Sequence, residues 1–94
     1  MKEVIADIAK TITDSIRDAE MQQGYAERAA KAGKADIAAK HIEEAMIRLN
    51  GAKMWIDLGS KLFGDDPLAE VLSEMLMAKH KAAMEKIAQF KPGA

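Results

Sequence analysis

Residues 36–63 constrain the fold more than any other stretch, because their apolar positions recur in alternating steps of four and three. Every position on this seam is apolar or glycine: Ala38, Ile42, Ala45, Leu49, Ala52, Ile56, Gly59 and Phe63. This spacing is typical of an α-helix that packs along one side against another helix. Small residues alternate with large ones, so a partner backbone can approach toward the short end of the usual interaxial distance of about 8–10 Å.

The preceding segment carries a similar seam and predicts a first helix over about residues 2–32. The seam positions again follow steps of three and four: Ile5, Ile8, Ile12, Ile16, Ala19, Gln23, Ala26 and Ala30. Gly33 suits the position just after this helix, because glycine adopts the left-handed conformation without a Cβ clash. Gly24 and Gly51 lie inside the first two segments and each costs a helix about 1 kcal/mol relative to alanine, so each is a candidate bend or break.

A third helix is expected over about residues 67–90, after a boundary at Gly64-Asp65-Asp66-Pro67. Asp66 can accept hydrogen bonds from the free N–H groups of the first turn, and Pro67 suits the first helical position, where no N–H is needed. The predicted inner row of this helix is Leu68, Leu72, Leu76, His80, Ala83, Ile87 and Phe90. Acidic residues lead and basic residues trail in this segment, which matches the helix dipole.

These segments predict an all-α fold with one domain over residues 1–94. The domain consists of three long antiparallel helices, of which the first two form a helical hairpin and the third packs against it. Alanine-rich seams bring the helices close together. The expected helices span about residues 2–32, 35–63 and 67–90, and connections of two to four residues force neighbouring helices to run antiparallel. A chain of 94 residues buries only a modest core. We therefore expect it to assemble as a homo-oligomer.

The composition argues against several partners and cofactors. Fourteen basic and fifteen acidic side chains nearly cancel, so we do not expect duplex nucleic acid or an anionic membrane as a partner. The chain has no cysteine and hence no disulfide framework and no cysteine-bound zinc. No stretch is apolar enough to span a membrane, and Glu3 and Asp7 interrupt the N-terminal apolar residues, unlike a signal-peptide core. We therefore expect a cytoplasmic location.

Few residues suggest catalysis or metal binding. His41 and Glu44 stand three apart and can share a helix face as metal ligands do, although a solvated face has the same pattern, and no Glu-x-x-His motif of the di-iron type is present. Ser15, Ser60 or Ser73 could in principle pair with a histidine, but none lies in a nucleophile motif. We expect a non-enzymatic protein with no metal and no cofactor.

A second apolar stripe lies beside the main seam from Gly51 onward. Its members are Met54, Trp55, Leu58 and Leu62. One interpretation is internal core, because a middle helix must contact both the first and the third helix. The other is an interface with a second copy or with another protein. The second interpretation predicts a protein that acts through protein–protein contacts and self-assembly.

The predicted turn between the first two helices is locally basic. Residues 25–41 contain four basic and two acidic side chains, with Tyr25 beside Arg28, Lys31 and Lys34. Tyr25 could stack on a base while the cations meet phosphates. A solvated, helix-stabilising face would have the same composition. The alternative partner for this protein is therefore a small anionic ligand, which would be bound by Tyr25, Arg28, Lys31 and Lys34.

The segment after this turn, Ala-Lys-His-Ile-Glu-Glu-Ala-Met at residues 39–46, carries a resemblance. Together with the basic turn, this segment makes the stretch of about residues 20–60 similar to the helical hairpin of a family of small phage proteins. Those proteins sequester cyclic oligonucleotide signals of bacterial anti-phage defence. The resemblance implies a compact, non-enzymatic helical oligomer that inhibits this defence, with ligand pockets between protomers lined by aromatic, lysine and arginine side chains. By position, Tyr25, Arg28, Lys31 and Lys34 are the residues that could correspond to this lining. The third helix is a departure from that family.

Overall fold

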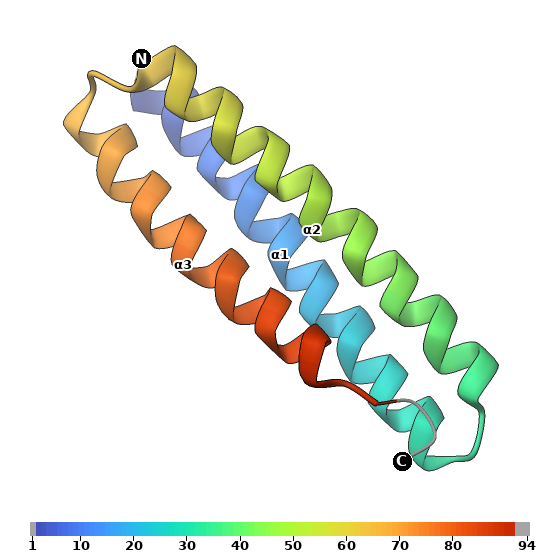
Figure 1. Cartoon of the computed structure of the whole chain (residues 1–94). Helices are drawn as coiled ribbons and strands as arrows, with labels where there is room; N and C mark the ends of the chain where they lie inside the picture. Colours follow the sequence, from blue (N-terminus) through green and yellow to red (C-terminus); the bar gives the residue numbers. More distant parts are fainter. Residues whose placement is uncertain (1, 92–94) are drawn as a thin grey trace.

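Three long α-helices lie lengthwise beside one another in the computed structural model, which describes residues 2–91. They are α1 (Lys2–Lys31), α2 (Ala35–Phe63) and α3 (Pro67–Gln89). Figure 1 shows that α2 runs antiparallel to both α1 and α3, so that the chain passes up, down and up. The bundle measures 49 × 18 × 14 Å. The predicted all-α, three-helix architecture is therefore confirmed.

The core lies along the line where the three helices meet, and α1 and α2 supply most of it. The buried positions of α1 are Ile5, Ile12, Ile16, Ala19, Gln23 and Ala26. Those of α2 are Ala38, Ala45, Leu49, Ala52 and Ile56. Only Leu76 and Ala83 are buried on α3. The predicted seams of α1 and α2 are thus mostly buried, whereas α3 covers the pair with a thinner row of side chains.

Small side chains on α2 bring α1 close. Ala38, Ala45 and Ala52 have no exposed surface, and a methyl group added at Gly59 would lie 3.9 Å from Cγ2 of Ile8. Because the small positions recur every seven residues, the two backbones stay near each other along the whole seam.

Both interior glycines lie within continuous helices. α1 passes through Gly24 and α2 through Gly51 without interruption, so the break considered at each position does not occur. The buried neighbours Gln23, Ala26 and Ala52 hold these turns against the core, and packing outweighs the low helix propensity of glycine. Gly33, by contrast, has a positive φ of 75° and reverses the chain between α1 and α2.

The start of α3 follows the predicted capping arrangement, with one correction. The Oδ1 atom of Asp66 accepts hydrogen bonds from the backbone N–H groups of Leu68 and Ala69, at 2.8 and 3.4 Å. Pro67 occupies the first turn.

Leu68 was expected in the inner row but is exposed. It lies eight residues before Leu76, which rotates it by about 80° away from the buried direction of this helix.

One contact from a side chain to the backbone and one contact between two side chains join α3 to α2. The Nε2 atom of His80 lies 3.0 Å from the carbonyl oxygen of Leu49. A carbonyl oxygen only accepts, so Nε2 carries the proton and donates. The hydroxyl groups of Ser60 and Ser73 lie 3.0 Å apart nearer the α2–α3 turn. These contacts fix which side of α2 faces α3.

The described residues include no helix with the length and apolar character that a bilayer crossing requires.

We predict that Gly24→Ala stabilises the protein. An added methyl group meets no atom within 4 Å, and alanine favours a helix interior by about 1 kcal/mol over glycine. For a domain of this size, the thermal midpoint should rise by roughly 4–8 °C at fixed protein concentration. Gly33→Ala is the matched control: its positive φ disfavours a Cβ, so its midpoint should fall. A lower midpoint for Gly24→Ala would contradict the continuous α1.

Candidate functional site

The residues singled out for function lie on two surfaces that occupy different parts of the hairpin (Figure 1). One is beside the turn that joins α1 to α2, and we call it the hairpin cluster. It contains Gln22, Tyr25, Arg28 and His41. The other is the side of α2 opposite its buried seam, and we call it the outer face of α2. It contains Ile47, Gly51, Met54, Leu58 and Leu62, with Trp55 at its edge.

In the hairpin cluster, three planar side chains from two helices meet. The ring centroids of Tyr25 and His41 lie 5.5 Å apart with an interplanar angle of 55°. The guanidinium carbon of Arg28 lies 5.0 Å from the Tyr25 ring centroid, within cation–π distance. On the other side, Nδ1 of His41 is 2.7 Å from Oε1 of Gln22. Since that amide oxygen accepts, Nδ1 is the protonated nitrogen in this contact.

Sequence spacing predicts the Tyr25–Arg28 part of this cluster but not its contact with His41. Tyr25 and Arg28 were predicted together, and a spacing of three does place them on one helix face. His41 was considered only as a metal ligand, yet it lies as far after Gly33 as Tyr25 lies before it. An antiparallel hairpin that turns at Gly33 therefore sets the two rings side by side. The equal distance of Tyr25 and His41 from Gly33 in the sequence is the observation from which this contact could have been predicted.

The remaining predicted residues of this region lie apart from the aromatic pair. Lys31 ends α1 and Lys34 immediately precedes α2, and both are exposed. Glu44 lies 3.8 Å from Arg48 on the same helix. In residues 2–91, no group of three His, Cys, Asp or Glu side chains is arranged to hold a metal ion.

The outer face of α2 is a row of large apolar side chains in solvent. The exposed fractions are 73% for Met54, 62% for Leu62, 55% for Ile47, 45% for Leu58 and 44% for Trp55. Neither α1 nor α3 covers this side of the helix. The interpretation of the stripe as internal core does not hold for Met54, Leu58 and Leu62, because α3 packs on the side of α2 that carries Leu49 and Ser60. Ile47 was not predicted, although it lies one heptad before Met54.

Trp55 also borders a small cavity between the three helices. This apolar space has a volume of about 30 Å³, roughly enough for one water molecule. Its lining includes Ile5, Gly59, Leu72 and the hydroxyl-bearing Ser73. A cavity of this size is far smaller than a ligand pocket of about 300 Å³ or more. Recognition by this chain is therefore better sought on its surface than in its interior.

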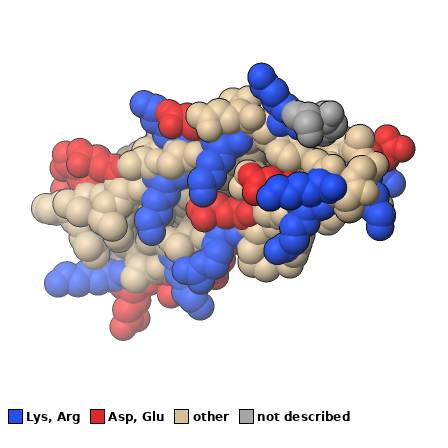
Figure 2. All heavy atoms as spheres, turned by 90° about the horizontal axis from the view of Figure 1, so that it is seen from below, with Lys and Arg blue, Asp and Glu red and all other residues tan. Residues whose placement is uncertain are grey.

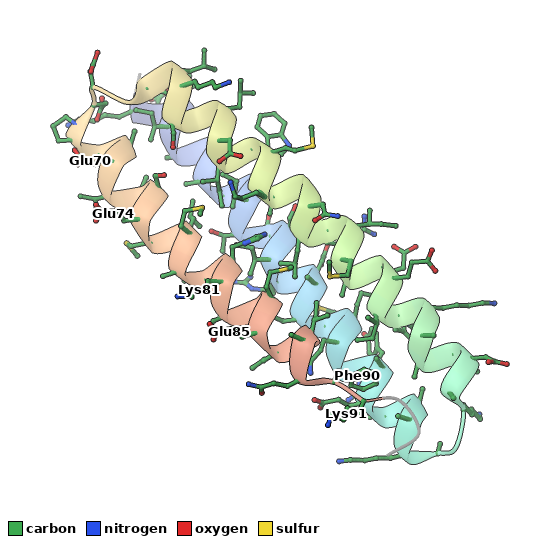
Figure 3. The ribbon with its side chains drawn as sticks, viewed as in Figure 1. Glu70, Glu74, Lys81, Glu85, Phe90 and Lys91 are labelled. Carbon is green, nitrogen blue, oxygen red and sulfur yellow. The ribbon has the colours of Figure 1, made fainter. Side chains whose placement is uncertain are left out.

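Charged side chains cover much of the remaining surface. In Figure 2 acidic and basic groups are interspersed over the face that is shown, without a field of one sign. Figure 3 shows Glu70, Glu74, Lys81 and Glu85 along the side of α3 that points away from the other helices. Val71 and Met75 are exposed among them. α3 thus also carries exposed large apolar side chains at helical spacing, Leu68, Val71 and Met75, but the set on α2 contains more of them.

Comparisons of the chain with protein-family models, with curated proteins and with solved structures gave no match. The residues of the two surfaces are therefore the basis for a functional proposal.

We predict that two substitutions at Tyr25 lower the free energy of unfolding by different amounts. Tyr25→Phe keeps the ring and should leave the free energy of unfolding within about 0.5 kcal/mol of the parent protein. Tyr25→Ala removes the ring contact and the cation–π contact, which together contribute about 1–2 kcal/mol. Urea unfolding at one protein concentration measures both variants. Equal losses for the two would show that the hydroxyl group, not the ring, stabilises the hairpin.

Proposed function

We propose that this protein is a small, non-enzymatic helical interaction protein that assembles with a second copy of itself through the outer face of α2. The observation that carries the proposal is the row of exposed apolar side chains opposite the buried seam. Scattered exposed apolar residues are ordinary on a monomer, but a continuous row at helical spacing is typical of a helix that packs on two sides.

Burial of this row would be favourable. Removing apolar surface from water contributes about 25 cal/mol per Å², and Met54, Leu62 and Ile47 are each more than half exposed. A two-fold interface uses the same surface on both subunits, so one apolar face on one helix is sufficient. Charged groups of both signs border the row, including Arg48 and Asp57, and provide the polar rim that protein interfaces have.

We predict that Leu58→Glu disrupts the assembly. The parent protein should have twice its chain mass of 10.2 kDa by light scattering after size-exclusion chromatography, and the variant should have the mass of one chain. Two buried carboxylates per dimer, each costing at least about 1.4 kcal/mol, weaken association about 100-fold or more.

Val71→Glu is the matched control, because Val71 is a similarly exposed apolar residue on α3. It should keep the parent mass, and circular dichroism should show equal helix content in all three proteins. A dimer that survives Leu58→Glu, or a parent protein that is monomeric throughout, would contradict the proposal.

A second candidate function is the binding of a small planar anion at the hairpin cluster. The favouring observation is that the Tyr25 and His41 rings and the Arg28 cation already lie in contact, with Lys31 and Lys34 exposed nearby in the chain. Base stacking on aromatic rings and guanidinium planes uses these groups. By its resemblance to the phage proteins, this chain would then sequester a cyclic oligonucleotide between protomers and inhibit a bacterial defence.

We predict for this candidate a ligand-dependent rise in thermal stability. A cyclic di- or trinucleotide at 100 times its dissociation constant should stabilise the protein by about 2.7 kcal/mol. Arg28→Ala should abolish the rise, whereas Lys10→Ala, on α1 far from the turn, should keep it. If no cyclic di- or trinucleotide shifts the midpoint, this candidate is removed and the proposal of self-assembly is unaffected.

A further inference from the structure

We infer that the two copies meet through antiparallel α2 helices, in the register that sets Ile47 of each copy opposite Leu58 of the other. This inference rests on the proposed self-assembly and specifies its geometry. It follows from the order of side chains along the outer face of α2, which is complementary to the same order read in reverse.

The apolar centre of the face has the spacing of a coiled-coil seam. Ile47, Gly51, Met54 and Leu58 follow one another in steps of four, three and four, the spacing by which one helix inserts side chains between those of another. In the inferred register Gly51 lies opposite Met54 of the other copy. Among residues 2–91 Met54 is the most exposed large apolar side chain, and a methyl group added at Gly51 would meet no neighbouring atom within 4 Å. A large side chain therefore meets a position with none.

Charged residues continue the same row at both ends. Going outward from the apolar centre, the next positions on α2 are Glu44 and Lys40 on one side and Lys61 on the other, and Asp65 lies in the turn just after α2 ends at Phe63. All four residues are exposed. In the inferred register Glu44 faces Lys61, so this layer joins opposite charges, and Lys40 lies level with the turn that carries Asp65. Two-fold symmetry repeats each pair at the other end of the interface.

Other registers lose this complementarity. Parallel helices in register would set Glu44 against Glu44 and Lys61 against Lys61, and like charges across an interface are repulsive. Moving the antiparallel pair by one heptad in one direction sets Ile47 level with Asp65, beyond the end of the partner's α2 at Phe63, so Ile47 loses its apolar cover. Moving it in the other direction sets Leu58 opposite Lys40. In both shifts Glu44 and Lys61 no longer face each other.

The register is tested by engineered disulfides, because the chain has no cysteine. In the Ile47→Cys/Leu58→Cys variant, mild oxidation should give a covalent dimer as the main species on a non-reducing gel. The two sites of one chain are eleven positions apart on α2, about 16 Å, so they cannot bridge within a chain when a disulfide needs Cα atoms about 4–7 Å apart. Ile47→Cys alone and Leu58→Cys alone should remain largely uncross-linked.

The other outcomes overturn the inference in distinct ways. Efficient cross-linking of Ile47→Cys alone would mean that the helices run parallel. Efficient cross-linking of Ile47→Cys/Leu62→Cys, with none for the Leu58 pair, would mean a shifted antiparallel register. In both cases a dimer by light scattering leaves the proposed function standing. A parent protein that is monomeric throughout overturns the proposed function and this inference together.

Charge reversal gives a second readout that requires no new covalent bond. Glu44→Lys places lysine opposite Lys61 twice in the dimer and should weaken association by about tenfold or more. Adding Lys61→Glu should restore most of the lost affinity, because positions 44 and 61 then again carry opposite charges, with the two signs exchanged. Glu85→Lys, on the outward side of α3 (Figure 3), makes the same charge change away from the interface and should leave the dissociation constant unchanged. An equal loss for the single and the double variant would contradict the register.

Discussion

Close packing between α1 and α2 is the contact on which the rest of the structure depends. Ala38, Ala45 and Ala52 are fully buried, and their size lets α1 lie near the α2 backbone along the whole seam. Large side chains fill the space between these positions, with Ile16 and Leu49 the largest that are almost completely enclosed. Once this seam fixes the rotation of α2 about its own axis, the directions of all its other side chains are fixed as well.

The position of α3 then decides which part of α2 stays exposed. His80 and Ser73 contact α2 at Leu49 and Ser60, so α3 covers one flank of the seam. Within residues 2–91, no other helix covers the opposite side of α2. The exposed apolar row is thus a consequence of two packing events: α1 fixes the rotation of the helix, and α3 occupies a flank that does not include Met54.

Much of the fold was predictable because it follows from local periodicity. The seams of α1 and α2, the turn at Gly33 and the cap at Asp66 all depend on residues close together in sequence. Leu68 was placed in the core wrongly, since one row of α3 was extended into a first turn that has already rotated outward. Gly24 was a candidate break because propensity was weighed without the tertiary packing that keeps α1 continuous.

The sites were less predictable, because they depend on which helices face one another. Tyr25 and Arg28 share a helix face, so their proximity could be inferred from spacing. The contact of Tyr25 with His41 requires the hairpin geometry. Whether Trp55 and Leu58 are core or surface required the position of α3, which the apolar pattern of α2 alone does not give.

The two surfaces also suggest how separate roles could share one helix. The hairpin cluster uses the beginning of α2, and the outer face uses its middle and end. Substitutions at Arg28 and at Leu58 therefore affect different contacts, and ligand binding and assembly can be examined independently.

We propose that a second copy of the chain covers the outer face of α2 in the native protein. The most direct measurement is the thermal midpoint of the parent protein over a hundredfold range of protein concentration. Association of folded chains stabilises them by mass action, so self-assembly should give a midpoint that rises steadily with protein concentration. An unchanged midpoint over the whole range, with complete refolding, would contradict it and would show that the apolar face of α2 does not bind its own copy.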